Sequence, residues 1–199
     1  PLTLALPAVY ARKKWDIPTA IWTFDIWPDA VYAYGFPKIF PLTTFVEHII
    51  RKVYNNVDSI IVSSKQFATT IAEYSTNKEI VYAPNWLLPA SNDKSDVRLP
   101  DGKINFTFTG NVSISQNLDN VIRGFVQANI PDSLLHIVGD GSTIEQHKQL
   151  SRELNCNNVD FHGRLPYVQM QDILHQSDYL VLPLISKSGI DKTEPFKIQ

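Results

Sequence analysis

Leu135-His136-Ile137-Val138-Gly139-Asp140-Gly141-Ser142 is an apolar run that ends in a glycine turn, and a helical pattern over residues 143–154 follows it. The run is short and rich in branched side chains, which is typical of a buried strand. In α/β folds, a strand, a tight glycine turn and a helix in this order present backbone N–H groups to a phosphate. The stretch therefore predicts an α/β fold, and its turn is either a nucleotide site or a sharp corner.

The same alternation extends along the whole chain. Seven short apolar runs, each bounded by turn residues, are separated by helical patterns, which favours βαβ units and doubly wound parallel sheets. The predicted strands are residues 19–23, 59–62, 79–82, 104–109, 134–138, 159–161 and 179–182, and the predicted helices are residues 46–55, 64–74, 118–128, 143–154 and 167–175.

The alternation breaks between Pro84 and Gly102, where two prolines and a cluster of Ser, Asn and Asp show no periodicity. Such a composition is typical of a linker. The sequence therefore predicts two α/β parts, residues 1–87 and 102–199, with a linker at 88–101.

The composition excludes several classes of function. A net charge of −2 gives no indication of a nucleic-acid partner. A single cysteine, Cys156, excludes a disulfide framework and favours a cytoplasmic location. The five histidines show no short metal-ligand spacing, so no metal site is predicted. Because the chain begins at Pro1 without a methionine, we expect it to be a piece of a longer protein.

Four predicted strands of the second part end in glycine or proline. Parallel strands place their carboxyl ends on one edge of the sheet, and open α/β sheets bind ligands at that edge. One Gly-x-Gly turn is more often a corner than a site, but four aligned turns are a stronger signal. The four turns begin at Gly110, Gly139, Gly163 and Pro183.

These segments, in this order, resemble the C-terminal domain of family 4 retaining glycosyltransferases (glycosyl transferases group 1), which have the GT-B fold. Two further segments strengthen the resemblance: Pro84-Asn85-Trp86 is similar to the turn between the two domains of such enzymes. Phe24-Asp25-Ile26-Trp27-Pro28-Asp29 looks like a turn of the capsule, exopolysaccharide and O-antigen subgroup. The four donor-domain segments are Phe106-Thr107-Phe108-Thr109-Gly110-Asn111, Ile137-Val138-Gly139-Asp140-Gly141, Val159-Asp160-Phe161-His162-Gly163-Arg164-Leu165-Pro166 and Ser177-Asp178-Tyr179-Leu180-Val181-Leu182-Pro183-Leu184.

The resemblance implies two Rossmann-like domains, each partly present: the rear of an acceptor domain in residues 1–87 and the front of a donor domain in 102–199. It implies a hexosyltransferase that moves a sugar from a UDP- or GDP-sugar to a hydroxyl of a glycan or lipid-linked acceptor, with retention and without a metal or other cofactor. It also implies a cytoplasmic enzyme, peripheral at the inner face of the membrane. Because each part lacks strands of its parent domain, we expect exposed apolar sheet edges, which leave pairing between two chains open. The stretch alone is not expected to be active.

The resemblance also implies site residues. The glycine loop after residue 109 lies nearest the diphosphate, the Gly-Asp-Gly corner lines the donor cleft, and the segment after residue 162 contacts the nucleobase. A variant of the paired-glutamate motif falls near the end of the chain. The implied donor-binding residues are Gly110, Asn111, Ser113, Gly139, Gly141, Gly163, Arg164, Leu165, Glu194 and Lys197.

Two departures from the family pattern bear on mechanism. The loop has Ser113 where many members place a cation, and the next cation is Arg123. Phe24 stands where a histidine is expected, which leaves Asp25 as the candidate catalytic residue. Asp25 is otherwise a turn or cap residue, which is a structural role.

Two alternatives remain open at the level of sequence. The chain is either an enzyme or a non-catalytic Rossmann-like module that binds a nucleotide sugar or a partner protein. An epimerase or dehydrogenase is disfavoured because Gly-x-Gly-x-x-Gly is absent. The basic segments Arg12-Lys13-Lys14-Trp15 and Arg51-Lys52 are either solvated helix faces or contacts to a membrane surface.

Overall fold

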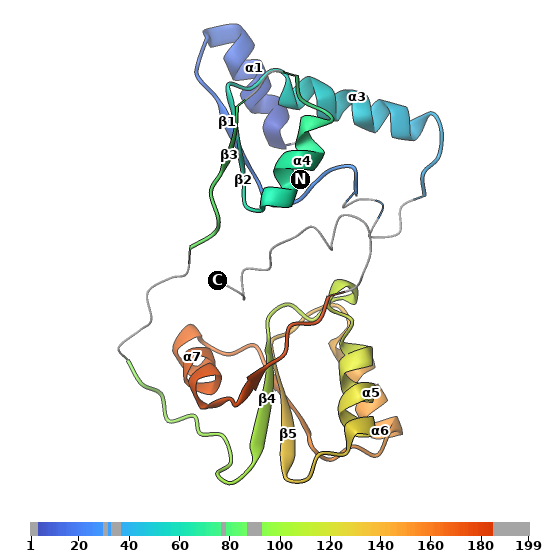
Figure 1. The fold of residues 1–199 in the computed structure, drawn as a ribbon, viewed down its shortest axis with the longest axis vertical. Helices are drawn as coiled ribbons and strands as arrows, with labels where there is room; N and C mark the ends of the chain where they lie inside the picture. The colour runs from blue at the N-terminus through green and yellow to red at the C-terminus, as the bar shows by residue number, and fades with distance from the viewer. Residues whose placement is uncertain (1–3, 30–31, 33–36, 77–78, 87–92, 185–199) are drawn as a thin grey trace. The chain divides into compact units, whose positions relative to one another are not determined.

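Two separate parallel sheets organise the chain (Figure 1). The computed structural model describes residues 4–29, 32, 37–76, 79–86 and 93–184. The described residues form two compact units, one within residues 4–86 and the other within residues 93–184. The predicted α/β class with parallel sheets is therefore confirmed.

The first unit contains a three-stranded sheet in the order β1-β2-β3, with all strands parallel. Its core forms where Ile60 and Val62 of β2 pack against buried side chains of the helices, such as Ile50 and Phe67. Ser64 caps α4 because its Oγ accepts a hydrogen bond from Gln66 N at 3.2 Å. The elements are α1 (Ala5–Trp15), β1 (Ala20–Thr23), α3 (Leu42–Tyr54), β2 (Ser59–Val62), α4 (Lys65–Ala72) and β3 (Ile80–Tyr82).

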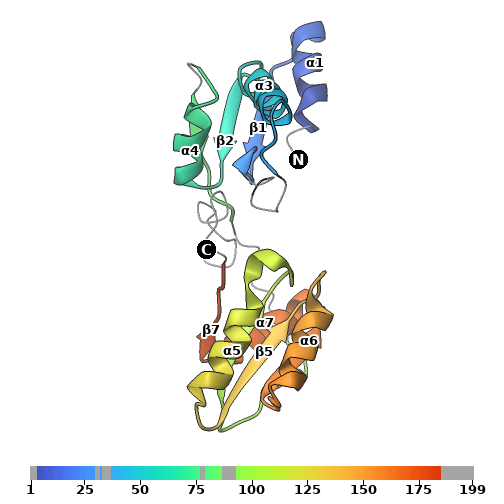
Figure 2. The same cartoon turned by 90° about the vertical axis from the view of Figure 1, so that its right-hand side faces the viewer.

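The second unit contains a four-stranded parallel sheet in the order β6-β5-β4-β7. Figure 2 shows this unit from the side of α5 and α6. Crossing from β4 outward to β5 and β6, and then back to β7, gives the doubly wound arrangement. The elements are β4 (Ile104–Thr109), the 3₁₀ turn η2 (Ile114–Gln116), α5 (Leu118–Ala128), β5 (Ser133–Val138), α6 (Ile144–Glu153), β6 (Val159–Gly163), α7 (Tyr167–Gln176) and β7 (Tyr179–Leu180).

Helices cover both faces of this second sheet, with α5 and α6 on one face and α7 on the other (Figure 1). Side chains alternate between the two faces along each strand. Phe108 and Ile137 pack with α5 and α6 residues such as Ile122. On the α7 face, Val138 packs with Leu99 and Ile173. This face also carries a buried polar row, Asn105, Thr107 and His136, which bears on the cluster described below.

The observed elements differ from the predicted ones where the apolar pattern carries no period. Helix α1 was not predicted as an element, because Ala5 and Val9 are its only buried residues and the rest of its surface is mixed. Helix α3 begins four residues earlier than expected, since Leu42 and Phe45 are exposed and do not follow its buried stripe. Strand β7 ends at Leu180, two residues early.

Part of the predicted linker belongs to the second unit. Both Ser95 N and Ser95 Oγ donate hydrogen bonds to Asp172 Oδ2 of α7, each at 2.6 Å. Leu99 N donates to Gln176 Oε1 at 3.0 Å, and the Leu99 side chain is buried. A loop can pack in this way because side chains of α7 satisfy its backbone N–H groups.

Candidate functional site

The two glycine turns of the second unit lie in direct backbone contact. A Cβ at Gly139 would lie 1.9 Å from Gly110 O, and a Cβ at Gly141 would lie 2.1 Å from Val112 O. Gly110 and Gly139 also adopt φ angles of +134° and +139°. The backbone conformation excludes a side chain at Gly110, the lack of space excludes one at Gly141, and both exclude one at Gly139, so glycine is required at both turns.

Hydrogen bonds lock these turns together beyond the ends of β4 and β5. Gly110 N donates to Val138 O at 2.9 Å, and Val112 N donates to Asp140 O at 2.9 Å. Gly139 N donates to Gly163 O at 2.8 Å, which brings the third predicted turn to the same edge. These glycine N–H groups are therefore already used within the protein, and the glycines serve close approach rather than direct donation.

Two backbone N–H groups of the loop after β4 are still available to a ligand. Among the described residues, Asn111 N and Ser113 N make no hydrogen bond. Asp140 Oδ1 accepts a hydrogen bond from Gly141 N at 2.7 Å, so this carboxylate closes its own turn. Ser113 Oγ lies 2.8 Å from Ser115 Oγ.

A cavity of about 610 Å³ opens at this edge of the sheet. It brings together six of the residues that the sequence analysis assigned to donor binding. Arg164 is the one cation among the described residues that line it, and its side chain is exposed. Glu194 and Lys197, which were also assigned to donor binding, lie outside the described residues. The lining residues are Gly110, Asn111, Val138, Gly139, Asp140, Gly141, Arg164, Leu165 and Met170.

Two predicted donor residues lie beside the cavity rather than in its wall. Gly163 contributes its carbonyl to Gly139 N, and its φ is +66° with no atom within 4 Å of where a Cβ would lie. Ser113 precedes η2 and is half-buried. Sequence reasoning missed Met170, because a single methionine on a helix carries no signal of which cavity it lines.

His147 of α6 is linked to the loop after β4 through Thr143. His147 Nε2 lies 3.1 Å from Thr143 Oγ1, and His147 Nδ1 lies 2.7 Å from Asp119 Oδ1 of α5. Thr143 in turn donates from both N and Oγ1 to Val112 O, at 3.3 and 3.2 Å. The chain from Asp119 to Val112 ties α5 and α6 to the loop. The four-residue spacing of Thr143 and His147 on one helix was the available signal.

A second polar group lies on the α7 face, where β5 pairs with β6 and places His136 opposite Asp160. His136 Nδ1 lies 3.0 Å from His162 Nε2 and 3.8 Å from Asp160 Oδ2. Burial lowers the pKa of both histidines, and each histidine's pKa is partly raised again by Asp160. Both rings are therefore held neutral at pH 7. Spacing along the chain gave no signal, because strand pairing makes the cluster.

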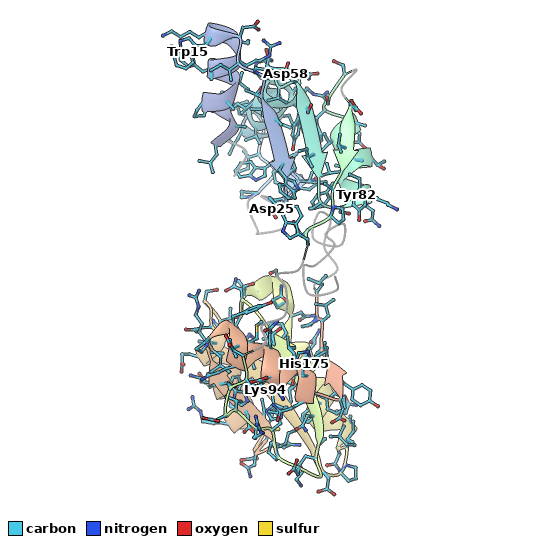
Figure 3. The ribbon with its side chains drawn as sticks, turned by 90° about the vertical axis from the view of Figure 1, so that its left-hand side faces the viewer. Trp15, Asp25, Asp58, Tyr82, Lys94 and His175 are labelled. Atoms are coloured by element: carbon cyan, nitrogen blue, oxygen red, sulfur yellow. The ribbon has the colours of Figure 1, made fainter. Side chains whose placement is uncertain are left out.

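In the first unit, Asp25 follows the carboxyl end of β1. Figure 3 shows it at the end of the sheet that also carries Tyr82, opposite the end with Asp58. Asp25 is exposed, and it makes no hydrogen bond with any residue that the structure describes. A cap bond, the structural alternative for Asp25, is thus absent from this part of the chain.

Aromatic side chains line the same groove as Asp25. Trp22 lies against both Phe24 and Trp86, with ring centroids 5.2 and 5.3 Å apart. A groove of about 390 Å³ runs past them and is lined by Trp22, Phe24, Asp25 and Trp27, together with residues of α1. No described helix of either unit is long and apolar enough to cross a bilayer.

Comparison with known proteins places these features in a family. The family model described as "Glycosyl transferases group 1" matches residues 90–198, which is more than half of the chain. The probable glycosyltransferase WbjE of Pseudomonas aeruginosa is 21% identical over 170 residues, covering 80% of this chain and 42% of that protein. The putative colanic acid biosynthesis glycosyl transferase WcaI of Escherichia coli is 24% identical over 173 residues, covering 81% and 41%. The chain thus spans less than half the length of these relatives.

Solved structures show the same fold. Sucrose-phosphate synthase from Thermosynechococcus elongatus superposes with a TM-score of 0.72 at 14% identity, covering 94% of this chain and 49% of that one. Anabaena Alr3699/HepE in complex with UDP-glucose superposes with a TM-score of 0.67 at 13% identity, covering 92% and 51%. These neighbours confirm the predicted GT-B type of α/β fold. By its match over residues 90–198, the chain belongs to the glycosyl transferases group 1 family.

Proposed function

We propose that the protein transfers a sugar from a nucleotide-diphosphate sugar to a hydroxyl of a glycan or lipid-linked acceptor, with retention, as a family 4 hexosyltransferase. The observation that carries this proposal is the cavity in which Gly110, Gly139 and Arg164 meet at the carboxyl ends of parallel strands. Anabaena Alr3699/HepE, whose fold is similar, was solved with UDP-glucose. The two sequence relatives are named as glycosyltransferases, one of them of colanic acid biosynthesis.

The diphosphate lies, in this proposal, over the loop after β4. The close contact of Gly139 with Gly110 leaves the Asn111 and Ser113 N–H groups as free donors. Backbone donors fixed before the reaction stabilise a developing negative charge without reorganisation. With Arg164 and Lys197 as cations, the leaving diphosphate needs no metal ion.

The nucleobase lies on the other side of the cavity. Leu165 lines the cavity with an apolar side chain, and Gly163, two residues earlier, lies beside the cavity in a left-handed backbone conformation. Met170 of α7 adds a deformable apolar wall. This surface suits a planar base and is proposed to bind uracil or guanine.

The acceptor is proposed to bind near Asp25. The Asp25 carboxylate is exposed in a groove that is also lined by aromatic rings, and such rings pack well against the apolar faces of sugars. Asp25 then orients the sugar or accepts the proton of the acceptor hydroxyl.

A lipid-linked acceptor requires the enzyme to work at a membrane surface. Helix α1 exposes Tyr10 and Trp15, and Lys14 Nζ lies 5.3 Å from the centroid of each ring. Aromatic and basic side chains of this kind suit the interface of an anionic membrane. We propose that the protein is cytoplasmic and peripheral at the inner face. Sedimentation with anionic vesicles, against neutral vesicles as the control, tests this.

The donor proposal is tested by calorimetric titration of the full-length protein with UDP- and GDP-sugars. Arg164→Ala is expected to weaken donor binding at least about tenfold, because it removes a charge-assisted contact. Arg152→Ala, which removes an exposed arginine of α6 outside the cavity, is the matched control and leaves binding unchanged. Equal affinity in both variants contradicts the proposed site.

The transfer step needs a separate measurement. Incubation with the bound donor and candidate acceptors, followed by NMR of the product anomer, is expected to show retention. Donor binding without transfer to any acceptor favours the alternative, a non-catalytic nucleotide-sugar module.

A further inference from the structure

The three polar side chains on the α7 face of β5 and β6 are arranged like metal ligands. His136 Nδ1, His162 Nε2 and an Asp160 carboxylate oxygen all lie within 4.8 Å of one another. His136 and Asp160 face each other across the strand pair, and a register shift after Ile137 brings His162 alongside them. Two strands thus supply three donor atoms from a rigid part of the sheet.

The hydrogen bonds of Asn105 fix which nitrogen of His136 is free. Asn105 Nδ2 donates to Lys103 O at 3.3 Å, so its Oδ1 faces His136. His136 Nε2 lies 3.0 Å from this oxygen and must carry the proton, since an amide oxygen only accepts. The lone pair of the neutral ring is therefore on Nδ1, the nitrogen that faces His162 and Asp160.

His162 Nε2, 3.0 Å away, can donate a hydrogen bond to this lone pair, but the Asp160 carboxylate cannot. Asp160 Oδ2 lies 3.8 Å from His136 Nδ1, and neither atom has a hydrogen to share with the other when the aspartate is ionised. A cation between such atoms removes the repulsion. A hydrogen-bond acceptor that holds the distal imidazole N–H, as Asn105 does here, is also the usual support of a histidine metal ligand.

The distances suit a small divalent ion. In a tetrahedral zinc site the donor atoms are about 3.3 Å apart, since bonds of about 2.0 Å meet near the tetrahedral angle. The separations of 3.0 and 3.8 Å bracket this value. His136 is buried, whereas His162 is half-buried and Asp160 is exposed, so an ion can enter from solvent.

We propose that His136, Asp160 and His162 bind a divalent transition-metal ion of the zinc class, with a water molecule in the fourth position. The ion joins β5 to β6 one residue before Gly163, and so stiffens the edge that carries Arg164. It acts on structure and is not part of the sugar transfer, so the proposal stands independently of the function proposed above.

The test uses the untagged full-length protein and Co²⁺, which absorbs visible light strongly in tetrahedral sites. One equivalent of Co²⁺ is expected to give this absorption, and Zn²⁺ is expected to displace it. His162→Gln removes one ligand at a half-buried position and is expected to weaken binding by more than about 100-fold. Asp160→Asn at the exposed position is expected to weaken it by at least about tenfold.

The matched control is His175→Gln, which removes an exposed histidine of α7 outside the cluster and leaves affinity unchanged. Circular dichroism of each variant establishes that the fold is retained. Zn²⁺ is also expected to raise the melting temperature of the wild-type chain but not of His162→Gln. The absence of tetrahedral Co²⁺ absorption, or equal affinity in His162→Gln and the wild type, overturns the proposal and leaves a hydrogen-bonded histidine pair.

Discussion

The carboxyl edges of the two sheets are built in opposite ways. At the edge of the second sheet, backbone meets backbone: Gly139 and Gly141 approach Gly110 and Val112 closely, and the N–H groups of the glycines are paired. At the edge of the first sheet, side chains form the surface, and Asp25 is exposed among tryptophans. A site formed by backbone atoms tolerates no added atom, whereas the activity of a site formed by side chains depends on their charge and their ability to exchange protons.

The largest expected effect is at the backbone edge. Gly139→Ala places a Cβ 1.9 Å from Gly110 O, so the loop after β4 must move. We expect donor binding to weaken more than about 100-fold and the melting temperature to fall. Titration with the preferred nucleotide sugar and a thermal scan measure both. Gly102→Ala is the control, because Gly102 lies in an exposed turn outside the cavity and its Cβ would meet no atom within 4 Å although φ is +73°. It is expected to cost about 1–2 kcal/mol of backbone strain and to leave donor affinity unchanged. A Gly139→Ala variant with wild-type affinity would show that the close approach is dispensable.

The next effect concerns the side-chain edge. Asp25→Asn keeps the shape of the residue and removes its charge, so a role as base predicts a loss of about 10²–10⁴ in kcat. The melting temperature is expected to stay unchanged, because Asp25 makes no hydrogen bond among the described residues. Steady-state kinetics of the full-length protein, together with a thermal scan, distinguishes a catalytic role of Asp25 from a structural one. If Asp25→Asn instead lowered the free energy of unfolding by about 1 kcal/mol and left kcat near the wild-type value, Asp25 would be a cap residue.

The same contrast explains what the sequence could predict. Glycine turns after apolar runs have a local cause, so the alternation of β4, α5, β5 and α6 and the meeting of Gly110 with Gly139 follow from short patterns. The cluster of His136 with Asp160 arises from strand pairing and register, which no local pattern encodes. Helix α1 buries too few side chains to show a period. Local motifs therefore predict backbone sites better than sites assembled from side chains.

A smaller effect concerns the response of the second unit to acid. Hydrogen bonds from Ser95 lower the pKa of Asp172. The same hydrogen bonds hold the segment around Ser95 against α7. Since the folded-state pKa is below the value of about 3.9 for an unfolded aspartate, this contribution to stability is full above about pH 4. It is lost as the pH falls further, through the folded-state pKa.

Asp172→Asn is therefore expected to lower the melting temperature at neutral pH and to reduce its fall below about pH 4. Thermal scans across this range measure the difference. Asp101→Asn, which changes an exposed turn aspartate, is the control and keeps the wild-type profile. If Asp172→Asn also retained the wild-type acid response, the contact between Ser95 and α7 would not contribute to the stability of the second unit.

The smallest expected effect is a stabilisation, although the substitution, glycine to alanine, is the same as in the variant with the largest effect. Gly124 lies inside α5, is exposed, and has no atom within 4 Å of an added Cβ. Here the cost of glycine is the entropy of its backbone in the unfolded chain, so Gly124→Ala is expected to stabilise the protein by about 0.5–1 kcal/mol. A thermal scan should show a slightly raised melting temperature and unchanged donor affinity. One added methyl group thus stabilises where the backbone is regular and solvated, and disrupts where two backbones touch. A destabilised Gly124→Ala variant would mean that α5 packs against something in the full-length protein, and the contrast with Gly139 would then reflect packing rather than backbone contact.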